Sequence, residues 1–313
     1  METVLRVIDV AKSFGDVKAV DGVSFGTRKG TITGLLGRNG AGKTTTLRMI
    51  NGVFLPDRGA IEVFGRDAAA ARDRIGYLPE ERGLYKKMTC DQVITYMAEL
   101  KAYPKAKIAP KVGPWLERME LGQYRYRKVE ELSKGMQQKL QFITTVLHEP
   151  DILILDELFS GLDPLNMELI KSVILDLKRH GTTILFSTHV MEQAEKLCDN
   201  ICMISRGKKV LDGALGDIKS RFGKNAIQLE IDGDGSFVRG LPGVKEVTDF
   251  NRYLELSLAD GADPDTILKG VLQRVRVRRF AIVEPSLYDI FIDTAKVDPS
   301  EVHGQPTAGG THA

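Results

Sequence analysis

The segment that most restricts the fold of this chain is Gly37–Thr44, which has the sequence GRNGAGKT. It follows an apolar run at Thr31–Leu36 and precedes a stretch of helical character that starts near Gly42. A strand, a turn with the spacing GxxxxGK[ST] and a helix, in this order, form a phosphate-binding loop. Its glycines let successive backbone N–H groups point at phosphate oxygens. The chain is therefore predicted to contain an α/β domain built around a phosphate loop.

The residues of this loop have different expected tasks. Lys43 is expected to reach the β and γ phosphates of a nucleotide, and Thr44 to offer its hydroxyl to Mg²⁺. The other predicted nucleotide contacts in this segment are Gly37, Arg38, Asn39, Gly40, Ala41, Gly42 and Thr45.

A second segment, Ile152–Glu157 (ILILDE), is typical of a buried parallel strand that ends in two acids. The carboxyl ends of such strands carry the ligand sites of α/β sheets. Asp156 suits a magnesium ligand, and Glu157 suits the general base that polarises an attacking water. Paired acids at a strand end can also cap a helix, but a phosphate loop upstream makes that alternative weak.

The rest of the chain alternates between strand and helix patterns, which indicates a parallel α/β sheet. From about Leu84 to His148, apolar residues recur every three to four positions, which predicts a helical subdomain at about 84–148. Short segments between residues 4 and 78 predict additional strands. Further buried strands are expected at Thr182–Ser187 and Ile201–Ser205, with helices at Pro164–Arg179 and Val190–Leu197.

Composition and simple sequence patterns argue against several other classes of protein. Lys and Arg total 44 against 42 Asp and Glu, so no overall charge favours nucleic acid. No apolar run approaches the roughly 20 residues that span a bilayer, and the N-terminus does not resemble a secretory signal. The three cysteines form no CxxC pair, so neither a zinc site nor a disulfide framework is expected.

Further motifs name a family. Leu132–Gln138 (LSKGMQQ) is similar to the LSGGQ signature of ABC ATPases, and Ser160–Asp163 (SGLD) and Ser187–His189 (STH) resemble their D-loop and switch histidine. Phe14 stands where that family has the aromatic ring that stacks on adenine. These features occur in the family's order across about Val4–Leu215. The chain is therefore identified as resembling the ATP-binding subunits of ABC transporters, with an ABC-type P-loop NTPase fold that combines an antiparallel β subdomain and a helical subdomain.

The resemblance implies a mechanism, cofactors and partners. ATP and Mg²⁺ would bind between two subunits arranged head to tail, so that Ser133 and Gly135 of one subunit meet the nucleotide of the other. The resemblance also implies that His189 contacts the γ-phosphate and that Asp163 lies near the nucleotide. The expected partners are a separate membrane-spanning permease and a second copy of this or a related ATPase subunit, and no nucleic acid. The expected location is the cytoplasmic face of a bacterial cell membrane, as a peripheral subunit.

Three departures from the family pattern are visible. Glu80 replaces the usual Q-loop glutamine, which makes it a candidate contact of both nucleotide and metal. Lys134 and Met136 replace Gly and Gln in the signature, and Leu158 replaces the proline after the catalytic glutamate. The segments Pro79–Tyr85 and 284–291 are similar to the bacterial sodium-exporter and drug-exporter ATPases.

The predicted domain organisation has three parts. Residues 1–220 form the nucleotide-binding domain, residues 221–298 an α+β accessory domain, and residues 299–313 a disordered tail. The accessory domain is expected to be ferredoxin-like, because a strand at Ala226–Ile231, a helical turn, two strands around Asp249–Asn251, a helix at Pro264–Arg274 and a strand at Val275–Val283 follow one another.

Two other functions are compatible with a phosphate loop. One is a soluble ABC protein of translation or DNA repair. The chain carries one cassette and has neither a long coiled-coil nor a zinc insert between Lys43 and Ser133, which argues against it. The other is a nucleotide switch without turnover, against which Glu157 argues.

Overall fold

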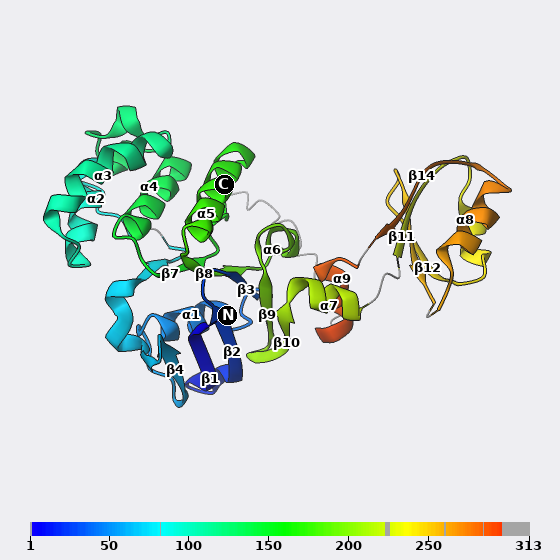
Figure 1. The fold of residues 1–313 in the computed structure, drawn as a ribbon, viewed down its shortest axis with the longest axis horizontal. Coiled ribbons are helices and arrows are strands. Elements are labelled where there is room, and N and C mark those ends of the chain that lie inside the picture. Colours follow the sequence, from blue (N-terminus) through cyan, green and yellow to red (C-terminus); the bar gives the residue numbers. More distant parts are fainter. Residues whose placement is uncertain (1, 82, 223–225, 260, 284, 296–313) are drawn as a thin grey trace, which may run out of the picture. The chain divides into compact units, whose positions relative to one another are not determined.

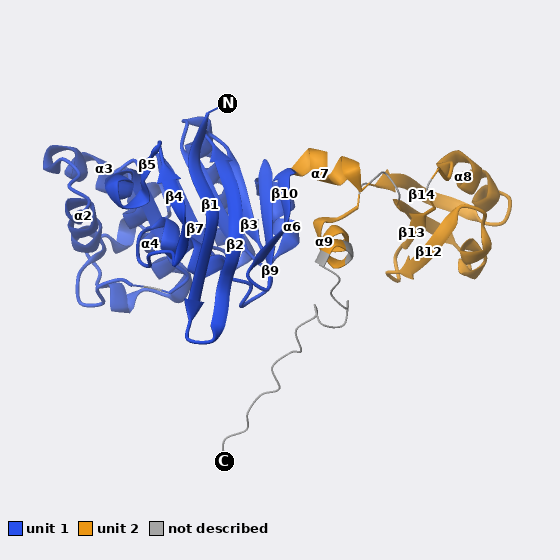
Figure 2. Ribbon diagram, turned by 90° about the horizontal axis from the view of Figure 1, so that it is seen from below, with its two compact units in different colours: residues 1–214 blue, residues 215–313 orange. Residues whose placement is uncertain are grey.

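The computed structural model describes residues 2–81, 83–222, 226–259, 261–283 and 285–295. The predicted tail, 299–313, lies outside the described residues. The chain divides into two compact units, residues 1–214 and 215–313 (Figure 2). The predicted boundary at residue 220 lies six residues further along the chain, and the domain limits inferred from the sequence stay a prediction.

A six-stranded sheet forms the centre of the first unit. The three strands in its middle have no exposed residue, which explains their uninterrupted apolar sequences. All neighbouring strands in this sheet are parallel except β9 and β10, which are antiparallel. In spatial order the strands are β10 (Lys208–Ala214), β9 (Asn200–Ser205), β3 (Ile32–Leu36), β8 (Thr183–Thr188), β7 (Ile152–Asp156) and β6 (Ile75–Leu78).

A second, antiparallel sheet confirms the predicted antiparallel subdomain. Its order is β2 (Val17–Arg28), β1 (Thr3–Phe14), β4 (Arg58–Val63) and β5 (Arg66–Asp67), followed by the 3-10 segment η1 (Ala68–Arg74). One hydrophobic core joins the two sheets to helix α1 (Lys43–Ile50). It contains Val7 of β1, Leu47 of α1 and Ile154 of β7, all at most 2% exposed. The phosphate loop is thus anchored between two sheets.

The helices of the first unit other than α1 fall into two groups. Helices α5 (Pro164–Arg179) and α6 (Met191–Leu197) belong to the crossovers of the central sheet. Helices α2 (Cys90–Leu100), α3 (Lys105–Arg118) and α4 (Lys134–Val146), with the short turns η2 (Gly122–Tyr124) and η3 (Val129–Glu131), form the predicted helical subdomain. Figure 1 shows α2, α3 and α4 grouped together, on the side away from β1, β2 and β4.

Local sequence explains where these helices begin. Thr89 starts α2 through a capping box in which its hydroxyl accepts from the Gln92 amide while the Gln92 side chain accepts from the Thr89 amide. Asp163 caps α5, and Pro164 occupies its first turn, where a missing N–H costs nothing. No helix of the described residues is long and apolar enough to cross a membrane.

The described residues of the second unit form a four-stranded antiparallel sheet and three α-helices. The sheet order is β12 (Val244–Asp249), β13 (Leu254–Leu258), β11 (Ala226–Asp232) and β14 (Arg276–Val283). This order matches the ferredoxin-like prediction, with the predicted helical turn present as the 3-10 turn η4 (Ser236–Gly240) and the predicted helix present as α8 (Pro264–Leu272). Two helices flank this module in the chain, α7 (Leu215–Arg221) and α9 (Leu287–Ala295), and neither was predicted from the sequence.

Candidate nucleotide-binding and catalytic site

The phosphate loop connects β3 to α1, and its shape requires glycine at two positions. Gly37 has φ 154° and Gly42 has φ 105°, in the region that residues with a side chain rarely adopt. A Cβ atom at Gly37 would lie 2.2 Å from the carbonyl oxygen of Ile204, and one at Gly42 would lie 2.4 Å from that of Ala19. The loop therefore packs backbone against backbone, and only glycine fits.

Lys43, the first residue of α1, is only 5% exposed. Its Nζ donates hydrogen bonds to the carbonyl oxygens of Gly37 (2.7 Å) and Arg38 (3.2 Å). The same nitrogen lies 3.2 Å from Oε1 of Glu157. The loop thus surrounds its own lysine and aims the ammonium at the end of β7.

The end of β7 carries Asp156, which is fully buried. Its Oδ1 accepts a hydrogen bond from the Ser187 hydroxyl, and the Thr44 hydroxyl lies 3.4 Å from the same oxygen. Its Oδ2 is buried without a hydrogen-bond partner in the described part of the chain. Burial raises the pKa of Asp156, although the Ser187 and Thr44 hydroxyls oppose that shift. A buried carboxylate oxygen without a partner, beside a hydroxyl, is a donor set that suits a hard cation such as Mg²⁺.

Glu157 follows β7 in the left-handed region, with φ 46°. A non-glycine residue held there carries backbone strain, a feature that gathers at functional sites. The Glu157 amide donates to the Ser187 carbonyl at 3.2 Å. The carboxylate lies between two cationic or basic groups, with Oε1 near Lys43 and Oε2 2.9 Å from Nδ1 of His189. Glu157 is 7% exposed, whereas the side chain of His189 is 44% exposed, so the pair connects a buried acid to the open surface.

The other predicted nucleotide contacts differ in exposure. Arg38, Asn39 and Gly40 are exposed on the loop, Ala41 is buried, and Thr45 is half-buried in α1. Phe14 is 46% exposed at the end of β1, with its ring centroid 5.3 Å from that of Phe54 in an edge-to-face arrangement.

Glu80 and the signature residues lie outside the buried cluster. Glu80 is exposed in the loop after β6 and has no hydrogen bond or ion pair among the described residues. Ser133 is exposed and caps α4, with its Oγ accepting from the Met136 amide at 3.3 Å. Gly135 lies in the first turn of α4.

Asp163 has both carboxylate oxygens engaged by one residue. Oδ1 accepts from the Asn166 amide at 3.0 Å, and Oδ2 accepts from the Asn166 side chain. These hydrogen bonds lower the pKa of Asp163. In this structure the carboxylate therefore holds the start of α5, whatever else it contacts.

Sequence reasoning missed Ser187 and Tyr77 as members of the site. Ser187 lies opposite Asp156 in the parallel register of β7 and β8 and contacts both acids. Tyr77 of β6 lies opposite Ile154 of β7 and has a buried hydroxyl. Burial, together with the negative charge of Asp156, raises the pKa of Tyr77 to about 12. The available signal was a polar residue at the end of a buried strand, but strand order was needed to interpret it.

A phosphate loop after β3, a buried acid at the end of β7 two strands away in the same sheet, and a glutamate beside that acid define a P-loop nucleotide hydrolase. The profile of the ABC transporter family matches residues 20–160, and that of the C-terminal domain of DrrA1-3-like ATP-binding proteins matches residues 213–295. This chain belongs to the family of ABC transporter ATP-binding proteins. It is accordingly an ATPase subunit that binds nucleotide, in a family whose members dimerise and work with membrane permeases.

Individual relatives agree with this placement. The chain is 45% identical to the uncharacterized ABC transporter ATP-binding protein YhaQ of Bacillus subtilis over 290 residues, which is 92% of this chain and 97% of the relative. It is 38% identical to the Nod factor export ATP-binding protein I of Paraburkholderia xenovorans over 233 residues, or 73% and 77% of the two chains. Among solved structures, an ATP-binding subunit of an ABC transporter superposes with a TM-score of 0.66 at 32% identity, covering 70% of this chain and 93% of that one.

Proposed function

We propose that this protein hydrolyses magnesium-bound ATP in two composite sites of a head-to-tail dimer, and that closure and opening of this dimer power export through a separate permease. The observation that carries the proposal is the position of Glu157. Its carboxylate stands at the end of β7, with Lys43 at 3.2 Å on one oxygen and His189 at 2.9 Å on the other.

The catalytic roles follow from these contacts. Lys43 exchanges its contacts with the loop carbonyls and Glu157 for the β and γ phosphates of ATP. Glu157 then orients a water molecule and accepts its proton, while His189 holds the carboxylate and reaches the γ-phosphate from the open side. Thr44 and Asp156 would hold Mg²⁺, with Glu80 as a further candidate. The bound metal would neutralise charge on the phosphates.

The signature segment supports a shared site. Ser133 and Gly135 lie at the start of α4, a helix of 13 residues whose N-terminus favours an anion. Ser133 is exposed. The sequence contains one phosphate loop, and that loop leads into α1 and not into α4. A second anion site on the surface is best explained if it serves the nucleotide of another subunit.

A route from the nucleotide to a permease is proposed along the loop 80–85, of which residue 82 lies outside the described part. The side chain of Gln141 in α4 donates to the Glu81 carbonyl at 3.2 Å. The Tyr85 ring lies 5.2 Å from the Tyr96 ring of α2, edge to face. Movement of α4 when its N-terminus meets a nucleotide would therefore pull on this loop and on α2, the surface that we assign to the permease.

The proposal also covers the direction of transport, the location of the subunit and the role of the second unit. The name of the Nod factor relative favours export, and we place the subunit at the cytoplasmic face of a bacterial membrane. Nucleic acid is not a proposed partner. We assign residues 221–298, which have no phosphate loop, to dimer support or regulation.

The decisive experiment uses Glu157→Gln. Without the base, ATP hydrolysis should fall by about 10²-fold or more, and ATP should lock the dimer because the γ-phosphate persists. Size-exclusion chromatography with light scattering should show a dimer in Mg-ATP and a monomer in ADP. Lys43→Ala is the matched control and should stay monomeric in both. Undiminished hydrolysis by Glu157→Gln would remove Glu157 as the base, and a monomer in Mg-ATP both with and without a permease would refute the shared site.

A further inference from the structure

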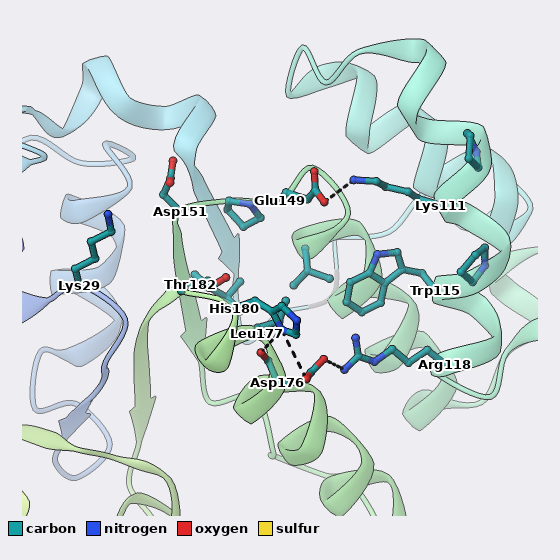
Figure 3. Close-up of a pocket in the computed structure, with 16 residues that line it drawn as sticks. Lys29, Lys111, Trp115, Arg118, Glu149, Asp151, Asp176, Leu177, His180 and Thr182 are labelled. Carbon is teal, nitrogen blue, oxygen red and sulfur yellow. Dashed lines mark hydrogen bonds and ion pairs between the residues drawn. The ribbon is translucent and has the colours of Figure 1, made fainter.

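A cavity of about 790 Å³ lies in the first unit, away from the phosphate loop (Figure 3). Asp151 and Thr182, which line it, precede β7 and β8, whereas the catalytic acids stand where β7 ends. Five strand residues, or roughly 16 Å, separate the two ends of β7. The cavity is therefore distinct from the nucleotide site.

The walls of the cavity are largely apolar. Helix α3 contributes Trp115, Pro110 and Pro114, and Leu177 of α5 and Leu153 of β7 line other parts of the cavity. In Figure 3 the indole of Trp115 projects from α3 toward the side where Leu177 and His180 lie. An aromatic ring with proline rings beside it offers flat apolar surfaces on which a planar molecule can stack.

The charged groups near Trp115 are already paired. Lys111 lies 2.6 Å from Glu149, and Arg118 lies 2.6 Å from Asp176. On the opposite side of the cavity, Asp151 lies 2.7 Å from Arg74, whereas Lys29 has no ion pair among the described residues. Figure 3 shows the first two pairs on either side of the Trp115 ring, with Lys29 at the far edge of the cavity. A charged ligand beside Trp115 would have to displace one of these partners or remain unpaired, and both outcomes cost free energy.

We propose that this cavity binds an uncharged aromatic small molecule, which stacks on Trp115. Its volume lies within the range of roughly 300–1,000 Å³ that small-molecule sites occupy. The ligand would contact α3, in the helical subdomain, and α5, which Asp163 caps. The site therefore connects the helical subdomain to the helix that follows the D-loop.

The chain contains a single tryptophan, so Trp115 is a direct reporter of this cavity. The test titrates the full-length protein with the neutral fluorophore phenyl-naphthylamine. Excitation of tryptophan should give saturable quenching of Trp115 and sensitised emission from the probe. Trp115→Phe keeps an aromatic wall, so it should bind the probe within about threefold of the wild-type affinity when the probe is excited directly, while losing the sensitised emission.

A matched pair of variants on α5 locates the probe. Leu177→Glu places an unpaired charge in the wall and should weaken binding at least tenfold, while labelled ATP binds as before and shows that the protein is folded. Leu165→Glu, the same change at an 85% exposed position of α5, should leave probe binding unchanged. Equal binding by both variants, or no quenching of Trp115, would overturn the proposal. Equally tight binding of the anionic analogue, anilinonaphthalene sulfonate, would overturn the assignment of an uncharged ligand.

Discussion

Gly135→Ala separates a folding role of the signature glycine from a role in binding a neighbour's nucleotide. Gly135 lies in the first turn of α4, and its φ is not in the left-handed region. A Cβ atom there would lie 3.6 Å from Nδ2 of Asn166, 3.9 Å from Cδ2 of Leu162 and 4.0 Å from Oδ2 of Asp163. These are ordinary van der Waals distances, so alanine fits the subunit without displacement.

The free subunit should consequently gain stability. Alanine is favoured over glycine inside a helix by roughly 0.5–1 kcal/mol. For a unit of about 200 residues, 1 kcal/mol corresponds to a rise in Tm of about 2–4 °C. Gly37→Ala is the contrasting variant, because its Cβ would lie 2.2 Å from the Ile204 carbonyl, and it should lower Tm instead.

The composite site predicts the opposite effect on catalysis. If the Gly135 amide donates to a γ-phosphate of the partner subunit, a methyl group at this position obstructs the approach. Loss of one charge-assisted hydrogen bond costs about 1.5–3 kcal/mol, which corresponds to about 10- to 150-fold in rate.

The assay measures three quantities on the same preparation. Thermal unfolding without nucleotide reports the fold, labelled ATP reports binding by the monomer, and phosphate release reports turnover. Gly135→Ala should retain thermal stability and ATP binding by the monomer but lose phosphate release. In a Glu157→Gln background it should weaken the ATP-dependent dimer. Turnover within twofold of wild type at an unchanged or higher Tm would refute a contact between Gly135 and the nucleotide.

Four further predictions follow from particular residues. Lys43→Ala should abolish binding of labelled ATP, and affinity within threefold of wild type would contradict the role of its ammonium. Glu80→Gln should make hydrolysis less steeply dependent on magnesium, because a carboxylate near the γ-phosphate repels it unless a metal lies between them; identical titrations would remove Glu80 from the site. A truncation after Ser220 should still bind ATP, and a folded truncate that binds none would refute the auxiliary role of the second unit. Burial, together with the nearby Lys101 ammonium, lowers the pKa of His148 from 6.5 to about 4. As pH falls from 6.5 toward 4, the unfolded chain therefore takes up more protons than the folded chain. The free energy of unfolding should drop by about 2 kcal/mol between pH 6.5 and pH 5. An equal dependence of this free energy on pH in His148→Leu, measured by urea denaturation, would show that His148 is not the cause.

Local features were predictable because the information lies within a few residues. The phosphate loop depends on glycines at Gly37 and Gly42, whose backbone angles belong to single positions. The apolar runs at β3, β7 and β8 correspond to strands that are buried along their whole length. The helix predicted at Pro164–Arg179 is present with the same bounds as α5. The family itself followed from the order of such local motifs.

Elements whose local sequence signals are incomplete were harder to predict. Helix α9 has Leu287, Ile290 and Phe291 at helical spacing, yet its nine residues follow a strand and a proline, and the sequence analysis gave it no structure. By contrast, the short helical turn that was predicted after the first strand of the accessory module is present as η4.

The sequence by itself determined the chemistry that is available: a lysine and a threonine on a phosphate loop, two acids at a strand end, and a histidine after another strand. Only the tertiary structure decided which of these groups meet. The parallel pairing of β7 with β8 puts Ser187 opposite Asp156 and brings His189 to 2.9 Å from Glu157, although these partners are about 30 residues apart in the chain. The cavity beside Trp115 likewise requires α3, α5 and β7 to converge. Contacts of this kind depend on strand order and register, which are set by the packing of the whole core rather than by any local run of residues.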